Sequence, residues 1–201
     1  MTWIKTIPYE EAEGQLLKLY ERVKGPDNNV DNIMLAHSLR PHSMTGHMTL
    51  YKNVLHNSRN TVEKWTLELF GVYTSMLNEC DYCVEHHFNG LKNLLKNDAY
   101  ARDIRKALVS EDWESIFEPK LVTALAYIEK LTRNPATLSE DDINKLRNAR
   151  WDDGEILEIN QVTAYFNYAN RTVLGLGINT EGDILGLSPN DSDDEQNWQH
   201  T

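Results

Sequence analysis

Cysteine is scarce in this sequence, because its 201 residues include two, Cys80 and Cys83. A disulfide between residues so close closes a very small loop and removes little conformational entropy from the unfolded chain. The disulfide framework of a small secreted domain is therefore excluded. In a reducing compartment, a pair with this spacing is typical of catalytic or metal-binding thiols.

Long hydrophobic runs are also missing. No apolar stretch approaches the roughly 18–20 residues that a membrane helix needs. The first residues form no apolar run of signal-peptide length, and the chain turns acidic at Glu10 and Glu11. We therefore expect a cytoplasmic protein that does not bind to a membrane.

Positive charge is in deficit. The formal net charge is −11, with 20 Lys and Arg against 31 Asp and Glu. No stretch supplies the basic stripe that nucleic-acid binding requires, so a nucleic-acid partner is excluded. The acidity favours solubility and specifies no partner.

Strand-like alternation is absent, and apolar residues recur with helical spacing almost throughout. The expected helices cover approximately residues 8–24, 31–38, 41–55, 61–77, 80–95, 98–109, 118–131, 139–150 and 153–174, with a helical turn at 112–116. Thr61 is a candidate N-cap, and Ser139 precedes an acidic first turn of the kind that follows an N-cap. The sequence predicts an all-α fold.

The C-terminal end differs in composition from the rest. From residue 178 onward there are six acids and no Lys or Arg, and Gly, Asn, Asp and Ser are frequent. We expect a helical domain over residues 1–177 and an acidic C-terminal arm or tail over residues 178–201. Ile184, Leu185 and Leu187 offer apolar groups with which this tail can dock on the body or on a neighbouring subunit.

The motif that carries chemistry is Cys80-Asp81-Tyr82-Cys83, at the expected start of a helix. Residues three apart share a helix face, so the two sulfurs can meet. The positive end of the helix dipole favours thiolate over thiol, and the thiolate is the nucleophile.

A histidine and a carboxyl group accompany this pair. His87 follows Cys83 by four residues, which places its imidazole on the same helix face, where it can take a thiol proton. His86 is rotated by about 100°, and we expect it at the surface or in an oligomer contact. Glu68 lies in an apolar stretch twelve residues before Cys80, where a half-buried acid could orient His87.

Together, Glu68, Cys80, Cys83 and His87 resemble the active-site signature of the alkylhydroperoxidase D (AhpD) and carboxymuconolactone decarboxylase-like family, in its peroxidase-related branch. The resemblance is closest over residues 40–110. It implies an all-helical, homo-oligomeric fold with its CxxCxxxH active site inside residues 61–95. It also implies a thiol peroxidase of antioxidant type, without metal or organic cofactor.

The resemblance implies a role for each residue. Cys83 attacks the hydroperoxide and becomes a sulfenic acid, Cys80 resolves it to a disulfide, and His87 with Glu68 forms the proton relay. A dithiol reductant protein or a small thiol then restores the pair. Tyr82 departs from the pattern, since the best-studied peroxidase members carry a histidine there and a phenol is a poor base near neutral pH. The reductant and the catalytic efficiency stay open.

A non-catalytic alternative also stays open, in which the chain is a redox-sensing or metal-binding helical oligomer. Zinc held by Cys80, Cys83 and a histidine is conceivable, but structural zinc usually takes a second ligand pair and no second cysteine pair exists.

Overall fold

A computed structural model describes residues 2–189, 194 and 197–200, and within these ranges the chain is all-α. The α-helices are α1 (Gly14–Val23), α2 (Asn32–Ala36), α3 (Pro41–Leu55), α4 (Lys64–Leu77), α5 (Asp81–Leu95), α6 (Asp98–Ser110), α7 (Pro119–Arg133), α8 (Glu140–Asn148) and α9 (Asp153–Leu176). Short 3₁₀ turns, which include Trp113–Ser115 inside the expected helical turn, connect some of them. None of the described helices is both long and apolar enough to cross a membrane.

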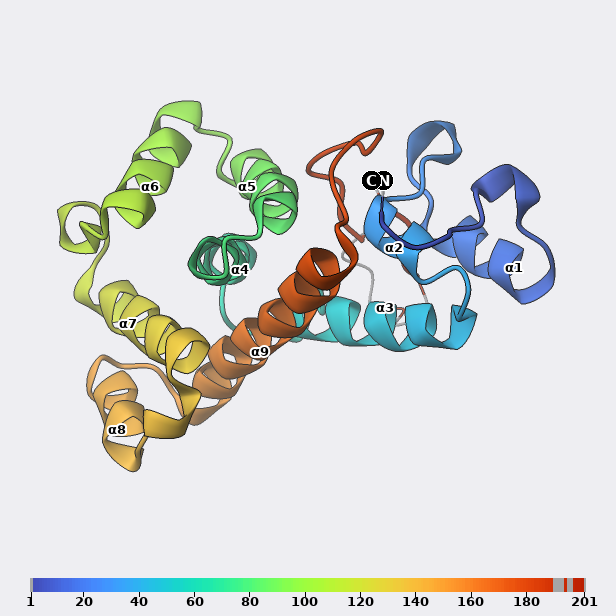
Figure 1. The fold of residues 1–201 in the computed structure, drawn as a ribbon. Helices are drawn as coiled ribbons and strands as arrows, with labels where there is room; N and C mark the ends of the chain where they lie inside the picture. Colours follow the sequence, from blue (N-terminus) through green and yellow to red (C-terminus); the bar gives the residue numbers. More distant parts are fainter. Residues whose placement is uncertain (1, 190–193, 195–196, 201) are drawn as a thin grey trace.

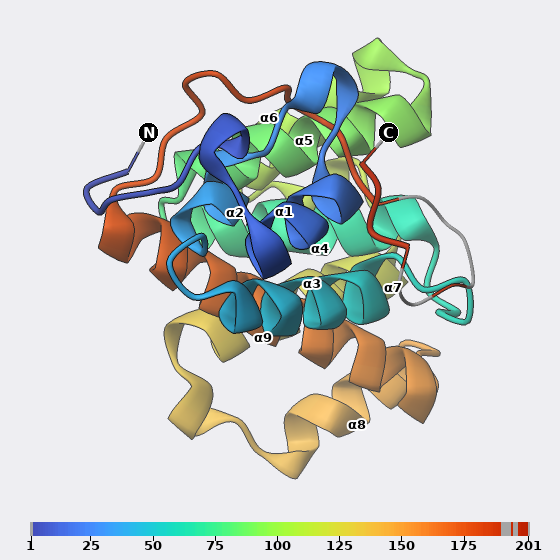
Figure 2. The ribbon, with the colours of Figure 1, turned by 90° about the vertical axis from the view of Figure 1, so that its right-hand side faces the viewer.

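The long helix α9 crosses the middle of the molecule (Figure 1). Helix α4 packs against α5, α7 and α9, and α3 lies along α9 from the other side. Figure 2, turned by 90°, shows α1 and α2 stacked over α3. The site described below lies where α2, α3, α5 and α9 meet.

Close packing between α4 and α9 depends on a glycine. A Cβ atom on Gly71 would lie 2.1 Å from Cε2 of Phe166, far inside contact distance. Phe166 is fully buried. The missing side chain therefore lets the Phe166 ring rest directly on the backbone of α4.

Some predicted helix starts are wrong. The helix expected from residue 61 begins at Lys64 with Glu63 as N-cap, because the Thr61 N–H and hydroxyl donate to the Glu158 carboxyl instead. The helix expected from residue 8 begins at Gly14, after a separate 3₁₀ turn at Tyr9–Glu11. The Ser139 N-cap is confirmed, since it forms a reciprocal capping box with Asp142.

The C-terminal segment folds back onto the body. Helix α9 ends at Leu176, and Gly177 takes the left-handed conformation with φ +61°. The chain then runs between α5 and α2 (Figure 1), where Ile178 is buried. Trp198 is buried under the guanidinium group of Arg22, whose Cζ lies 3.6 Å from the ring centroid. Of the tail acids, Asp191, Asp193 and Glu195 lie outside the described residues.

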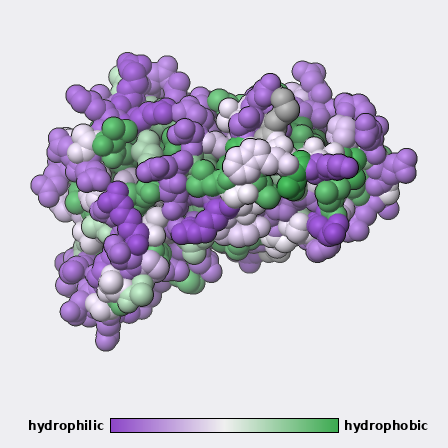
Figure 3. Space-filling model, in the orientation of Figure 1, coloured by the Kyte–Doolittle hydropathy of each residue, from purple (hydrophilic) through white to green (hydrophobic). Residues whose placement is uncertain are grey.

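Apolar side chains also reach the surface. Figure 3 shows them in a band across the middle of one face, between hydrophilic regions. Exposed large apolar residues include Trp3 near the N-terminus and Leu157, Tyr168 and Leu174 on α9.

Candidate functional site

The turn between α4 and α5 fixes the first cysteine. Glu79 takes the left-handed conformation with φ +55°, and the backbone N–H of Cys80 donates to the Ser75 carbonyl at 2.9 Å. Cys80 thereby becomes the N-cap of α5. The sulfur sits at the positive end of the helix dipole, as expected from the sequence.

Cys83 lies one turn into α5 and faces a cavity of about 40 Å³. Both cysteines are free thiols and both are buried, but Cys83 lines the cavity and Cys80 does not. A small molecule in the cavity therefore meets the second sulfur first.

A hydrogen bond couples the two thiols. A hydrogen bond from Cys83 lowers the pKa of Cys80, and the same interaction, together with burial, raises the pKa of Cys83 well above its usual value. The first negative charge in the resting pair thus belongs to Cys80. The proton lies between the sulfurs, so its transfer to Cys80 leaves the charge on Cys83.

Asn170 on α9 is a site residue that the sequence reasoning missed. It is fully buried, and its side chain lowers the pKa of each cysteine by hydrogen bonding. Its amide donates to Ser75 Oγ at 3.0 Å and accepts from Asn78 at 2.9 Å, which fixes its orientation. One feature of the sequence could have indicated this role: Asn170 is an amide on the apolar face of α9, four residues after Phe166.

The predicted histidine and glutamate come together. Nδ1 of His87 lies 2.8 Å from Oε2 of Glu68, whose side chain is 2% exposed. If the carboxyl group accepts, His87 carries its hydrogen on Nδ1, and Nε2 stays available to take a proton. The His87 ring packs edge-on against Phe166 and, with Cys83, lines the cavity.

A second histidine lies behind Glu68. Nε2 of His56 is 3.9 Å from Oε1 of Glu68, and among the described residues neither ring nitrogen of His56 has a hydrogen-bond partner. Burial lowers the pKa of His56 well below 6.5, so the ring is neutral at pH 7. It adds no positive charge beside Glu68.

Aromatic and histidine side chains complete the cavity wall. Tyr51 and Tyr165 stack with ring centroids 5.4 Å apart, and burial raises the pKa of both phenols well above 10. Burial lowers the pKa of His47 to about 3 and that of His200 to about 4. These four side chains are neutral at pH 7.

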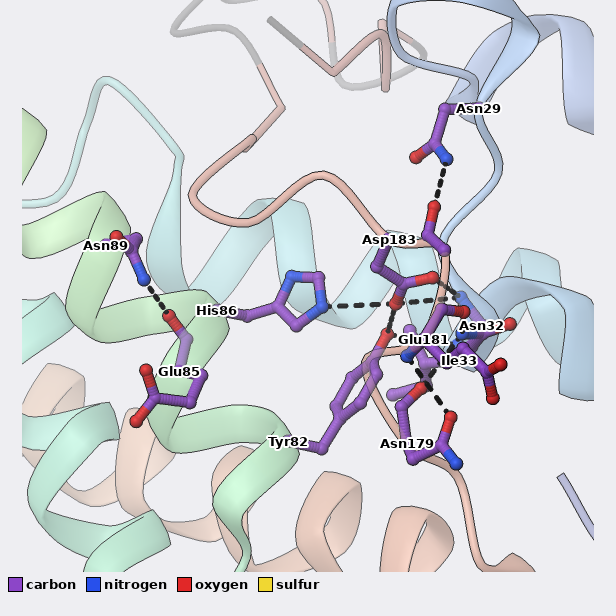
Figure 4. Close-up of polar contacts among 11 residues, drawn as sticks. Asn29, Asn32, Ile33, Tyr82, Glu85, His86, Asn89, Asn179, Glu181 and Asp183 are labelled. Carbon is purple, nitrogen blue, oxygen red and sulfur yellow. Dashed lines mark hydrogen bonds and ion pairs between the residues drawn. The ribbon is translucent and has the colours of Figure 1, made fainter. Parts of the chain in front are cut away.

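Tyr82 and His86 meet a carboxyl group from the C-terminal segment (Figure 4). The Tyr82 hydroxyl donates to Oδ2 of Asp183 at 2.7 Å, and Nε2 of His86 lies 3.1 Å from the same oxygen. The expectation that His86 lies at the surface or in an oligomer contact is wrong, because it is buried and lines the cavity. Tyr82, the residue that departs from the family pattern, donates its hydroxyl hydrogen to Asp183.

In the part of the chain that the structure describes, no group of three or more His, Cys, Asp and Glu side chains is placed to hold a metal ion.

Comparison with known proteins gives structural likenesses. No family model and no curated protein sequence matches the chain. The crystal structure of the alkylhydroperoxidase AhpD core of an uncharacterised peroxidase-related protein from Ralstonia eutropha JMP134 matches at 20% identity and a TM-score of 0.75, over 92% of this chain and 96% of that one. An uncharacterised peroxidase-related protein from Silicibacter sp. TM1040 matches at 22% identity and a TM-score of 0.75, over 90% and 93%.

A further match has another activity. The debrominase Bmp8, as a variant in complex with 2,3,4-tribromopyrrole, matches at 14% identity and a TM-score of 0.69, over 89% of this chain and 91% of that one. At these identities the likeness concerns the fold. The resemblance seen in the sequence is confirmed at that level: this chain has the all-helical fold of the AhpD-like, peroxidase-related proteins.

Proposed function

We propose that the protein is a thiol-dependent peroxidase of antioxidant type that reduces hydroperoxides with the Cys80–Cys83 dithiol. One observation carries the proposal. Cys83 lines a small cavity beside His87, which Glu68 holds at 2.8 Å, while Cys80 lies behind it within hydrogen-bonding reach. A nucleophile, a resolving thiol and a proton acceptor thus meet at one place.

The reaction proceeds in two steps. The Cys83 thiolate attacks the terminal oxygen of the hydroperoxide, the O–O bond breaks, and Cys83 becomes a sulfenic acid while the alkoxide takes a proton and leaves as an alcohol. The Cys80 thiolate then attacks the Cys83 sulfur, the S–S bond forms, and hydroxide leaves and takes a proton as water. The two protons come from the two thiols, and His87 carries them.

A dithiol protein or a small thiol restores the pair by thiol–disulfide exchange. Under the same proposal the chain forms a homo-oligomer. The exposed Leu157, Tyr168 and Leu174 on α9 are apolar groups that such an assembly can cover.

Dehalogenation, suggested by the Bmp8 likeness, is less well supported. One fold hosts different reactions, so the site must decide. The cavity beside Cys83 measures about 40 Å³, and a water-sized molecule takes roughly 10–15 Å³ on this measure. The cavity volume is far below the roughly 300–1,000 Å³ of a pocket for a drug-sized ligand, which favours a small hydroperoxide over a halogenated ring.

Two cysteine variants test the proposal. Cys83→Ser should abolish hydroperoxide consumption, because the attacking sulfur is lost. Cys80→Ser should leave a Cys83 sulfenic acid that dimedone traps, because the resolving sulfur is lost. Thiol titration, dimedone labelling and metal analysis of the purified protein are the readouts.

Full peroxide-dependent thiol oxidation by Cys83→Ser would rule out the assigned roles. Stoichiometric zinc bound through both cysteines would favour the metal-binding alternative. A reversible disulfide formed without multiple turnover in the presence of dithiol reductants would favour a redox sensor.

A further inference from the structure

The C-terminal segment supplies part of the cavity wall. Leu187 and His200 line the same cavity as Cys83 and His87, although they follow α9 by many residues. Helices α2, α3, α5 and α9, with Asp31 at the N-cap of α2, provide the other lining residues. The segment lies between α5 and α2 (Figure 1), and its Leu187 and His200 add to the wall that the helices form.

Asp183 anchors this segment on two helices at once (Figure 4). It accepts from Tyr82 and from the backbone N–H of Asn32, at 2.7 Å and 3.0 Å, and it lies 3.1 Å from Nε2 of His86. Its side chain is 2% exposed. A buried carboxyl group with this many polar contacts holds a defined position.

The backbone around Asp183 is held as well. The Asn32 amide donates to the carbonyls of Asn179 and Glu181 at 2.9 Å each, and the Asn29 amide donates to the carbonyl of Gly182 at 2.9 Å. Three backbone carbonyls of the segment, within four residues of one another, are therefore tied to Asn29 and Asn32. The anchor does not depend on a single side chain.

Two glycines bring Leu187 into the wall. Gly186 takes φ +85°, and a Cβ atom there would lie 2.9 Å from Cβ of Asn89, so the segment presses on α5. A Cβ atom on Gly25 would lie 2.7 Å from Cδ1 of Leu187. Leu187 is thus held between the loop at Gly25 and the cavity.

The space left is small. At about 40 Å³, the cavity holds about three water-sized molecules. Because Leu187 and Cys83 line the same small space, we expect it to admit hydrogen peroxide and the Leu187 side chain to hinder a hydroperoxide with an aromatic ring.

We propose that the C-terminal segment determines substrate size: Leu187 restricts the site to hydrogen peroxide and similarly small hydroperoxides, and Asp183 positions the segment. This inference rests on the proposed peroxidase function and adds its substrate class. Leu187 acts as a steric limit, and Asp183 is a positioning residue.

The experiment compares kcat/KM for hydrogen peroxide and for cumene hydroperoxide. The wild type should prefer hydrogen peroxide. Leu187→Ala should shift the ratio toward cumene hydroperoxide by about tenfold or more, since the apolar groups removed each discriminate by roughly that factor. Leu187→Met should keep the wild-type ratio. Leu185→Ala is the matched control, because Leu185 is in the same segment, is partly exposed and does not line the cavity.

Asp183→Asn should move the ratio in the same direction as Leu187→Ala, because the amide cannot accept from all the donors that the carboxyl group serves. A second readout needs no turnover. In Cys80→Ser, the rate of Cys83 alkylation by iodoacetamide relative to N-phenylmaleimide should fall when Leu187 is also replaced by alanine.

Equal kcat/KM values for both hydroperoxides in the wild type, or an unchanged ratio in Leu187→Ala, overturn the size limit and leave the peroxidase function standing. A wild type that consumes neither hydroperoxide refutes the peroxidase function, and the size limit falls with it. An alkylation ratio that Leu187→Ala leaves unchanged also overturns the size limit.

Discussion

At the scale of single residues, access and proton affinity divide the two sulfurs. Cys83 faces the cavity, but its pKa is raised, whereas the pKa of Cys80 is lowered although Cys80 lies behind it. A hydrogen-bonded pair reconciles these properties. One proton transfer from Cys83 to Cys80 places the charge on the accessible sulfur. After the attack, loss of that proton from Cys80 to His87 restores a thiolate that can resolve the sulfenic acid.

The Asn170 side chain should stabilise the thiolate form of the two cysteines. In Asn170→Ala the thiolate absorbance near 240 nm should appear at higher pH than in the wild type, because the side-chain hydrogen bond that lowers the pKa of both sulfurs is removed. Asn167→Ala is the matched control: Asn167 is on the same helix and contacts Asn78, but it does not act on the cysteines. An unchanged midpoint in Asn170→Ala would show that the amide does not stabilise the thiolate.

Asp31 should give stability a pH dependence. Burial raises its pKa from 3.8 to about 7, with His86 opposing this shift and Asp183 adding to it. The unfolded chain releases this proton near pH 4 and the folded chain near pH 7, so the Asp31 contribution is fully present below pH 4 and is lost as pH rises to about 7.

In the wild type, the Asp31 carboxyl group should lower the free energy of unfolding by about 2–4 kcal/mol as the pH rises from 4 to 7. In Asp31→Asn this decrease should be absent. Urea denaturation at a series of pH values measures it. Asp27→Asn, an exposed carboxyl group in the same connection, is the control and should keep the wild-type profile. If the Asp31→Asn and wild-type profiles run parallel, Asp31 does not hold its proton in the folded state.

At the scale of elements, the contact between α4 and α9 supports the relay. Phe166 rests on Gly71 of α4 and touches the His87 ring, with centroids 4.6 Å apart. Glu68 comes from the same helix as Gly71. The spacing of α4 and α9 therefore affects both groups that position His87.

Gly71→Ala should destabilise the protein by about 1–3 kcal/mol or more, because its Cβ overlaps the Phe166 ring. Gly46→Ala, at an exposed position of α3 with no atom within 4 Å of the added Cβ, should instead stabilise it by about 0.5–1 kcal/mol. Chemical denaturation measures both. Equal effects of the two substitutions would mean that α4 and α9 do not pack this closely.

How much the sequence predicts depends on whether an interaction is local. The Ser139 capping box involves residues that are close in the sequence, so the sequence predicts it. Thr61 is not an N-cap, because its donors bind Glu158, which is far away along the chain. The Glu68–His87 pair spans two adjacent helices, so spacing could suggest it. Asn170 and Asp183 reach the site from α9 and the tail, and no local pattern specifies those contacts.

At the scale of the whole molecule, the C-terminal segment packs against helices from earlier in the chain. Asp183 in the C-terminal segment contacts α2 and α5, and Leu187 completes the cavity. The Cys83 sulfur therefore lies in a site whose wall comes from the helices and from the C-terminal segment. Under the proposed function, this small site takes a small oxidant.

The most direct test of the central claim is titration of the reduced wild-type protein with hydrogen peroxide, followed by intact-mass and peptide analysis. We predict that one equivalent of peroxide is consumed per chain, with loss of two hydrogen atoms and formation of a Cys80–Cys83 disulfide that a dithiol reverses. A dithiol that survives excess peroxide, or cysteines that gain oxygen without forming the disulfide, would contradict it.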